Sequence, residues 1–152
     1  MAIEVNGIAG LKELVGTHLG HSEWMEITQE RVNTFADATG DHQWIHIDPE
    51  RAKDGPFGGT IAHGYLTLSL GPALMPTIAT VTGVRMGVNY GMDKVRFVSP
   101  VPVGANLRLG AELTKVDDLP GNGAQVYMTF TFECEGSEKP SCVAEIIFRY
   151  YE

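Results

Sequence analysis

The spacing of apolar residues changes near the middle of the chain, from a helical repeat to the alternation that is typical of strands. In the first half, Leu11, Leu14 and Val15 predict a short helix. A second helix is predicted after Thr28, whose hydroxyl can cap its first turn, and Gly40 is suited to end it. The first half of the chain is therefore expected to be helical.

A long apolar segment follows these helices. Residues 61–75 are apolar on nearly all sides, which predicts a helix that is buried rather than lying on a surface. A short third helix is predicted over 50–53, because Asp48 can cap it and Pro49 suits its first position. A glycine-rich loop at 56–59 separates the two.

Alternating and β-branched residues dominate the second half and predict long antiparallel strands. These strands are expected at 85–98, 106–117, 125–135 and 142–151. Pro120-Gly121-Asn122-Gly123 is a turn signal, residues 89–91 suggest a bulge, and 22–27 predict one more strand. Together these features predict an α+β fold in which a long antiparallel sheet wraps around the buried central helix.

Composition indicates one globular domain over residues 1–152, since 43% of residues are hydrophobic and no repeat or linker interrupts the chain. The net charge is −8 and no block of Lys or Arg occurs, which argues against a nucleic-acid partner. No leader-like segment and no apolar run of membrane-spanning length is found, so we expect a cytoplasmic protein with no membrane association. Long strands leave sheet edges, so homodimerisation through an edge is also expected.

The two cysteines, Cys134 and Cys142, lack the spacing of a metal site and are expected to be free, buried or half-buried thiols.

Candidate chemistry is concentrated just after the second helix. Asp41 and His46 lie on a loop where their side chains can converge on one water molecule and act in general acid–base catalysis. The alternative is that Asp41 caps a turn and His46 is structural. A second candidate is His63-Gly64, at the start of the central helix, where a backbone N–H can receive a developing oxyanion. Here the alternative is that Gly64 permits close packing and His63 caps or packs.

Taken together, these residues resemble the (R)-specific enoyl-CoA hydratase motif of the MaoC-like dehydratase family, whose members have the hotdog fold. The matching positions are Phe35, Thr39-Gly40-Asp41, Ile45-His46, Ala52 and Ala62-His63-Gly64. The likeness extends from about residue 24 to residue 150. It departs at Gln43-Trp44, where the family pattern has Asn-Pro, and this change is expected to alter the loop, the pocket wall and hence substrate preference.

The resemblance implies hydration of trans-2-enoyl thioesters to (3R)-hydroxyacyl thioesters, or the reverse dehydration, in fatty acid metabolism. Asp41 and His46 would activate the water, and the backbone N–H of Gly64 would polarise the thioester carbonyl. The substrate would be an acyl-CoA or an acyl-carrier-protein thioester, and no metal or other cofactor would be required. Two alternatives stay open on the same scaffold: an acyl-CoA thioesterase and a non-catalytic subunit that binds acyl thioesters.

Overall fold

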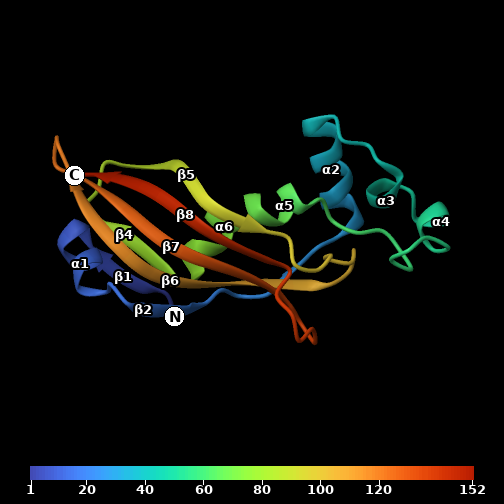
Figure 1. Cartoon of the computed structure of the whole chain (residues 1–152), viewed down its shortest axis with the longest axis horizontal. Helices are drawn as coiled ribbons and strands as arrows, with labels where there is room; N and C mark the ends of the chain where they lie inside the picture. Colours follow the sequence, from blue (N-terminus) through green and yellow to red (C-terminus); the bar gives the residue numbers. More distant parts are fainter.

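The computed structural model describes residues 1–152 and contains a curved antiparallel sheet of six strands that wraps around a helical segment (Figure 1). The strands of this sheet are β2 (Thr17–His21), β3 (Met25–Glu26), β5 (Met86–Arg96), β6 (Asn106–Leu119), β7 (Gly123–Cys134) and β8 (Cys142–Tyr151). Their order is β2-β6-β7-β8-β5, with β3 paired to β6. The predicted α+β architecture is therefore confirmed.

Side-chain alternation explains why these segments form strands. Along β7, buried and half-buried positions alternate, so that Val126, Met128, Phe130 and Phe132 all point into the core. The edge strand β5 differs, because it pairs only with β8 and most of its side chains are exposed. Its register shifts between Asn89 and Gly91, which confirms the predicted bulge.

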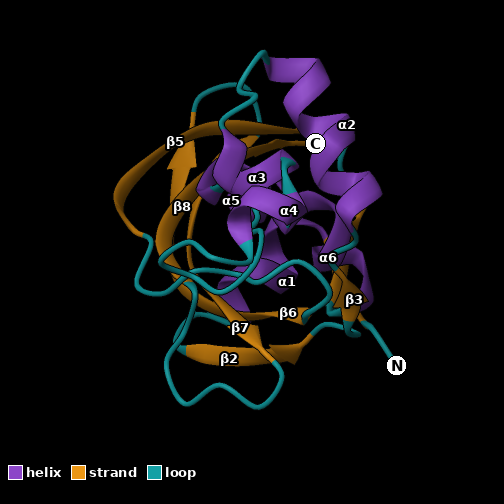
Figure 2. Ribbon diagram, turned by 90° about the vertical axis from the view of Figure 1, so that its right-hand side faces the viewer, coloured by secondary structure: helices purple, strands orange, loops and turns teal.

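The helices are α1 (Gly7–Glu13), α2 (Gln29–Thr39), α3 (Trp44–Ile47), α4 (Pro49–Ala52), α5 (Gly64–Ser69), α6 (Gly71–Leu74) and a 3₁₀ turn, η1 (Met75–Thr77). As predicted, the Thr28 hydroxyl caps α2 by accepting a hydrogen bond from the Arg31 N–H. Gly40 ends α2 in the left-handed conformation, with φ 84°. Helices α2, α3 and α4 lie together beyond one end of the sheet (Figure 1), and Figure 2 looks onto this end of the molecule.

The central helix differs from the prediction in continuity and in burial. It is divided into α5, α6 and η1, because Pro72 and Pro76 have no N–H to continue the helical hydrogen bonds. The prediction that it is buried rather than lying on a surface is wrong for one face, where Tyr65 is 73% exposed. Leu66 and Leu70, on the other face, pack in the core.

Local signals also missed or misplaced some elements. β1 (Ile3–Asn6) and β4 (Ala79–Thr82) form a separate parallel pair that was not predicted, and neither was α3. The strand expected over 22–27 is reduced to β3, while β2 lies before it. None of the helices is long and apolar enough to cross a membrane.

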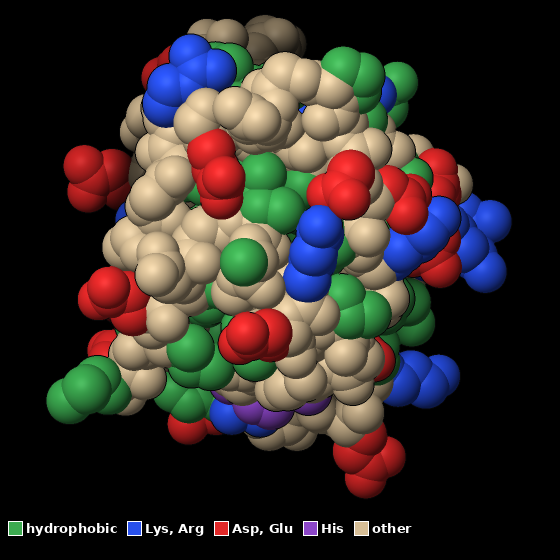
Figure 3. All heavy atoms as spheres, turned by 90° about the vertical axis from the view of Figure 1, so that its left-hand side faces the viewer, with side chains coloured by type: hydrophobic (Ala, Val, Ile, Leu, Met, Phe, Trp, Pro, Cys, Tyr) green, Lys and Arg blue, Asp and Glu red, His purple; other side chains and the backbone are tan.

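At the end of the molecule that carries the β6–β7 turn, acidic and basic side chains lie interspersed (Figure 3). The Lys12 ammonium, for example, lies 2.7 Å from an Asp118 carboxylate oxygen. Positive charge is thus not gathered into one patch on this face.

Candidate active site

Three ionisable side chains meet where the loop after α2 approaches the start of α5. Each of Asp41, His46 and His63 offers one nitrogen or oxygen atom, and these atoms lie within 4.8 Å of one another. The Asp41 side chain is 53% exposed, whereas His46 and His63 are buried, with exposed fractions of 6% and 2%. The group therefore joins one half-exposed carboxylate to two imidazoles that water scarcely reaches.

The main chain determines which ring nitrogen of a neutral His46 carries the proton. Its Nδ1 lies 2.7 Å from the carbonyl oxygen of Ile61, and a carbonyl can only accept a hydrogen bond. Nδ1 must therefore carry the proton, which leaves the Nε2 lone pair free to accept another one. Gln29 of α2 supports this arrangement by donating to the His46 carbonyl at 2.7 Å, and Thr60 in turn donates to Gln29 at 2.7 Å.

His63 contacts both of the other side chains. Its Nε2 donates to the Asp41 carbonyl oxygen at 2.9 Å, and its ring stacks on His46 with 3.8 Å between centroids and 23° between planes. Phe35 of α2 covers it, with ring centroids 4.9 Å apart. Burial lowers the pKa of His63, which favours the neutral ring. Its Nδ1 has no hydrogen-bond partner.

Gly64 begins α5, so its N–H has no acceptor within the helix. A side chain here would be crowded, because a Cβ atom would lie 3.0 Å from Cδ1 of the Phe97 ring. Glycine thus keeps the backbone accessible from the cavity that it lines.

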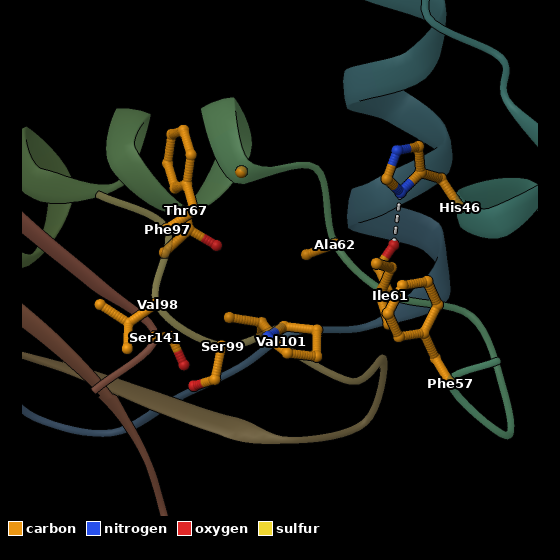
Figure 4. Close-up of a pocket in the computed structure, with 12 residues that line it drawn as sticks. His46, Phe57, Ile61, Ala62, Thr67, Phe97, Val98, Ser99, Val101 and Ser141 are labelled. Atoms are coloured by element: carbon orange, nitrogen blue, oxygen red, sulfur yellow. Dashed lines mark hydrogen bonds between the residues drawn. The ribbon is translucent and has the colours of Figure 1, made fainter. Parts of the chain in front are cut away.

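The cavity beside Gly64 has a volume of about 300 Å³ and a mostly apolar wall (Figure 4). Its lining consists of His46, Phe57, Ile61, Ala62, Gly64, Thr67, Phe97, Val98, Ser99, Pro100, Val101 and Ser141. Figure 4 shows the His46 ring at one end of this group, bonded to Ile61. His46 and Gly64 therefore line the same apolar space, and the half-exposed Asp41 lies next to His46.

The same three side chains have the composition of a metal site, but their geometry suits an ion poorly. The lone pair of an imidazole nitrogen lies in the ring plane, and Zn²⁺ binds it at about 2.0–2.1 Å. Because His46 and His63 are stacked, an ion equidistant from both would lie well outside each ring plane. The stack of His46 and His63 is better suited to restraining the orientation of the two rings than to binding an ion.

Trp44 occupies the first position of α3, after Gln43 at the N-cap. Proline is favoured at the first position of a helix. The helix α3 begins at Trp44, so this chain has Trp at the position where the family's proline would also suit a helix start. Its indole packs 3.2 Å from the Cβ position of Gly55 and 4.3 Å from the Arg51 guanidinium. Trp44 does not line the cavity, which contradicts the expected change in the pocket wall; an effect on substrate preference stays a prediction.

The chain is similar in sequence to known proteins of one family. Residues 11–130 match the model of the MaoC-like domain. The chain is 55% identical over 143 residues to 3-hydroxyacyl-thioester dehydratase Z of Mycobacterium tuberculosis, which covers 94% of this chain and 95% of that protein. It is also 44% identical over 148 residues to nodulation protein N of Rhizobium leguminosarum, covering 92% of this chain and 88% of the relative.

Among solved structures, an (R)-hydratase from Pseudomonas aeruginosa superimposes with a TM-score of 0.74 and 26% sequence identity. That match covers 93% of this chain and 85% of the hydratase. The similarity confirms the hotdog fold expected from the sequence.

Proposed function

The chain belongs to the MaoC-like dehydratase family, and we propose that it interconverts trans-2-enoyl and (3R)-hydroxyacyl thioesters by adding or removing water. The observation that carries this proposal is the position of His46, whose Nε2 has no hydrogen-bond partner, which lies with Asp41 in one cluster of ligand atoms within 4.8 Å of one another, and which lines the same cavity as Gly64. Two of the similar proteins support it, one being a 3-hydroxyacyl-thioester dehydratase and the other an (R)-hydratase.

In the hydration direction, the Asp41 carboxylate and His46 Nε2 hold the water molecule by accepting its two protons in hydrogen bonds. His46 Nε2 takes one proton as the water oxygen forms its bond to C3 of the substrate. The proton held by the pair is then returned to C2 on the same face, so that the elements of water are added across the double bond. Dehydration follows the same steps in reverse.

Negative charge develops on the thioester oxygen when water adds to C3. The Gly64 N–H is proposed to donate a hydrogen bond to this oxygen, and the absence of a side chain lets the carbonyl approach. The apolar wall of the cavity strengthens this interaction by keeping water away. Because the C2–C3 pair is neither oxidised nor reduced overall when water is added, the reaction has no need of a redox cofactor.

The substrate is proposed to be an acyl-CoA or acyl-carrier-protein thioester of fatty acid metabolism. The reaction is proposed to take place in the cytoplasm. We propose further that residues 1–152 act as one domain, since a single core of 26 buried residues unites the sheet with the helices.

Apolar surface on the edge strand supports a homodimer. Val88, Tyr90 and Met92 on β5 are exposed by 41%, 56% and 45%, and Tyr65 of α5 is exposed by 73%. An open edge with exposed apolar side chains is a suitable surface for a second copy of the chain. Analytical ultracentrifugation is expected to give a dimer, and a monomer at micromolar concentration would contradict this part of the proposal.

The reaction itself is tested with crotonyl-CoA and purified protein, without added cofactor, by following the absorbance of the enoyl thioester. The proposal predicts loss of absorbance, a (3R)-hydroxy product on chiral analysis, and no free thiol. Released thiol would instead support a thioesterase. Binding of acyl-CoA without turnover of short or long enoyl chains would support a non-catalytic subunit.

A further inference from the structure

His63 connects parts of the proposed active site that the chain otherwise leaves apart. We infer that His63 is a positioning residue, which holds the Asp41 loop and the His46 ring in register with the neighbouring Gly64 N–H. The inference rests on the proposed function, because it assigns His63 a part in the chemistry of Asp41 and His46 without contact with the substrate.

The hydrogen bond from His63 is a part-buried restraint on a loop whose other side-chain hydrogen bonds, between His42 and Asp37 and from the Gln43 N–H to Asp41, are exposed. The Asp41 side chain is half exposed, and it accepts only a 3.4 Å hydrogen bond from the Gln43 N–H. His63 is 2% exposed and donates to the Asp41 carbonyl at 2.9 Å. The buried His63 side chain therefore fixes the position of the Asp41 backbone, from which the half-exposed carboxylate extends.

The stacked ring restrains the second catalytic side chain. His46 is held at one edge by Ile61 and on one face by His63, at a centroid distance of 3.8 Å. Together these contacts leave the Nε2 edge of His46 as the part that is free to meet water. The ring of His63 is itself held in place by Phe35.

The unpartnered Nδ1 of His63 shows that packing alone does not explain the residue. A phenylalanine could stack in the same place without leaving a buried polar atom unpaired, which is unfavourable. What only the imidazole supplies is the Nε2–H that reaches the Asp41 carbonyl. The groups facing His63 are Asp41, His46, His42 and the Phe35 ring, and a neutral His63 adds no positive charge beside His46.

Two variants separate the two contacts. His63→Phe keeps a stacked ring but loses the hydrogen bond, whereas His63→Gln keeps an amide N–H near the position of Nε2 and loses the stack. Since small displacements of catalytic groups are costly, we expect His63→Phe to lower kcat by about tenfold or more. KM is expected to stay within about twofold, because a residue that does not touch the substrate leaves ground-state binding unchanged. His63→Gln should recover part of the lost kcat.

A readout independent of turnover is hydrogen exchange of the backbone amides at 40–43, which should become faster in His63→Phe. His18→Phe is the matched control, because His18 also contacts another histidine, with centroids 5.0 Å apart, but on β2. Wild-type kcat and exchange in His63→Phe would overturn the inference. If that variant does not fold, wild-type kcat in His63→Gln would overturn it, and lowered kcat at unchanged KM would support it.

The two proposals fail in different ways. If the wild-type protein does not turn over enoyl thioesters, the proposed function fails. Exchange at 40–43 still reports whether His63 restrains the Asp41 loop, and unchanged exchange would then overturn the inference as well.

Discussion

Replacing Asp41 by asparagine separates activity from stability. The side chain is 53% exposed and its one side-chain hydrogen bond, from the Gln43 N–H, is 3.4 Å long. Asparagine has nearly the same shape and can accept that bond, so the free energy of unfolding should change by less than about 0.5 kcal/mol. A neutral amide, however, is a weaker acceptor for the water and cannot share the proton that His46 removes, so loss of the carboxylate from this acid–base pair should lower kcat by about 100-fold or more. This loss corresponds to an increase of about 2.7 kcal/mol in the activation barrier.

The assay combines turnover of crotonyl-CoA with urea unfolding of the same preparations. Asp54→Asn is the matched control, because Asp54 is an exposed aspartate that lies outside the group of Asp41, His46 and His63. It should retain wild-type kcat. An Asp41→Asn protein with kcat within about threefold of wild type would remove the carboxylate from the mechanism, since a general acid–base group contributes about 100-fold or more. A large loss of stability would show that the half-exposed side chain has a structural role that its contacts do not explain.

Three further predictions concern packing, thiols and pH. Gly64→Ala keeps the N–H but pushes a Cβ to 3.0 Å from Phe97, so kcat/KM should fall by about fivefold to tenfold, and adding Phe97→Ala should restore part of it. Cys134 and Cys142 are buried, and burial raises the pKa of the Cys142 thiol to about 11, so native protein at pH 8 should resist a thiol reagent that labels both cysteines after unfolding. Burial lowers the pKa of His63 below its ordinary value of 6.5. Between the two pKa values, His63 therefore binds a proton in the unfolded chain but not in the folded one. Stability should therefore fall as pH decreases below 6.5 towards the folded pKa, and this part of the decrease in Tm should be absent in His63→Phe.

The elements that could be predicted are those whose signals are local. Helix α2 has a capping threonine and a terminal glycine within its own sequence, and β8 was predicted with the bounds that the structure shows. The proximity of Asp41 and His46 also follows from their separation of only five residues, although His46 lies in the unpredicted helix α3 and not on a loop. The sequence alone was therefore sufficient to nominate these two side chains together.

What could not be predicted depends on residues far apart in the chain. β1 and β4 pair Ile3 with Ala79, and the sequence near either residue carries no signal for this pairing. Tyr65 on the exposed face of α5 is itself a large aromatic residue, so its type did not distinguish it from the buried Leu66. The role inferred for His63 was missed for the same reason, because its stacking on His46 is a tertiary contact.

The backbone and the side chain of Ile61 have different roles. Its main-chain carbonyl fixes the proton of His46, and its own N–H is anchored on the Ile45 carbonyl at 3.0 Å. Its side chain lines the cavity. Replacing that side chain can reshape the space available to an acyl group without touching the group that sets the state of the base. The protein thus offers engineers a position where selectivity can be varied independently of catalytic competence.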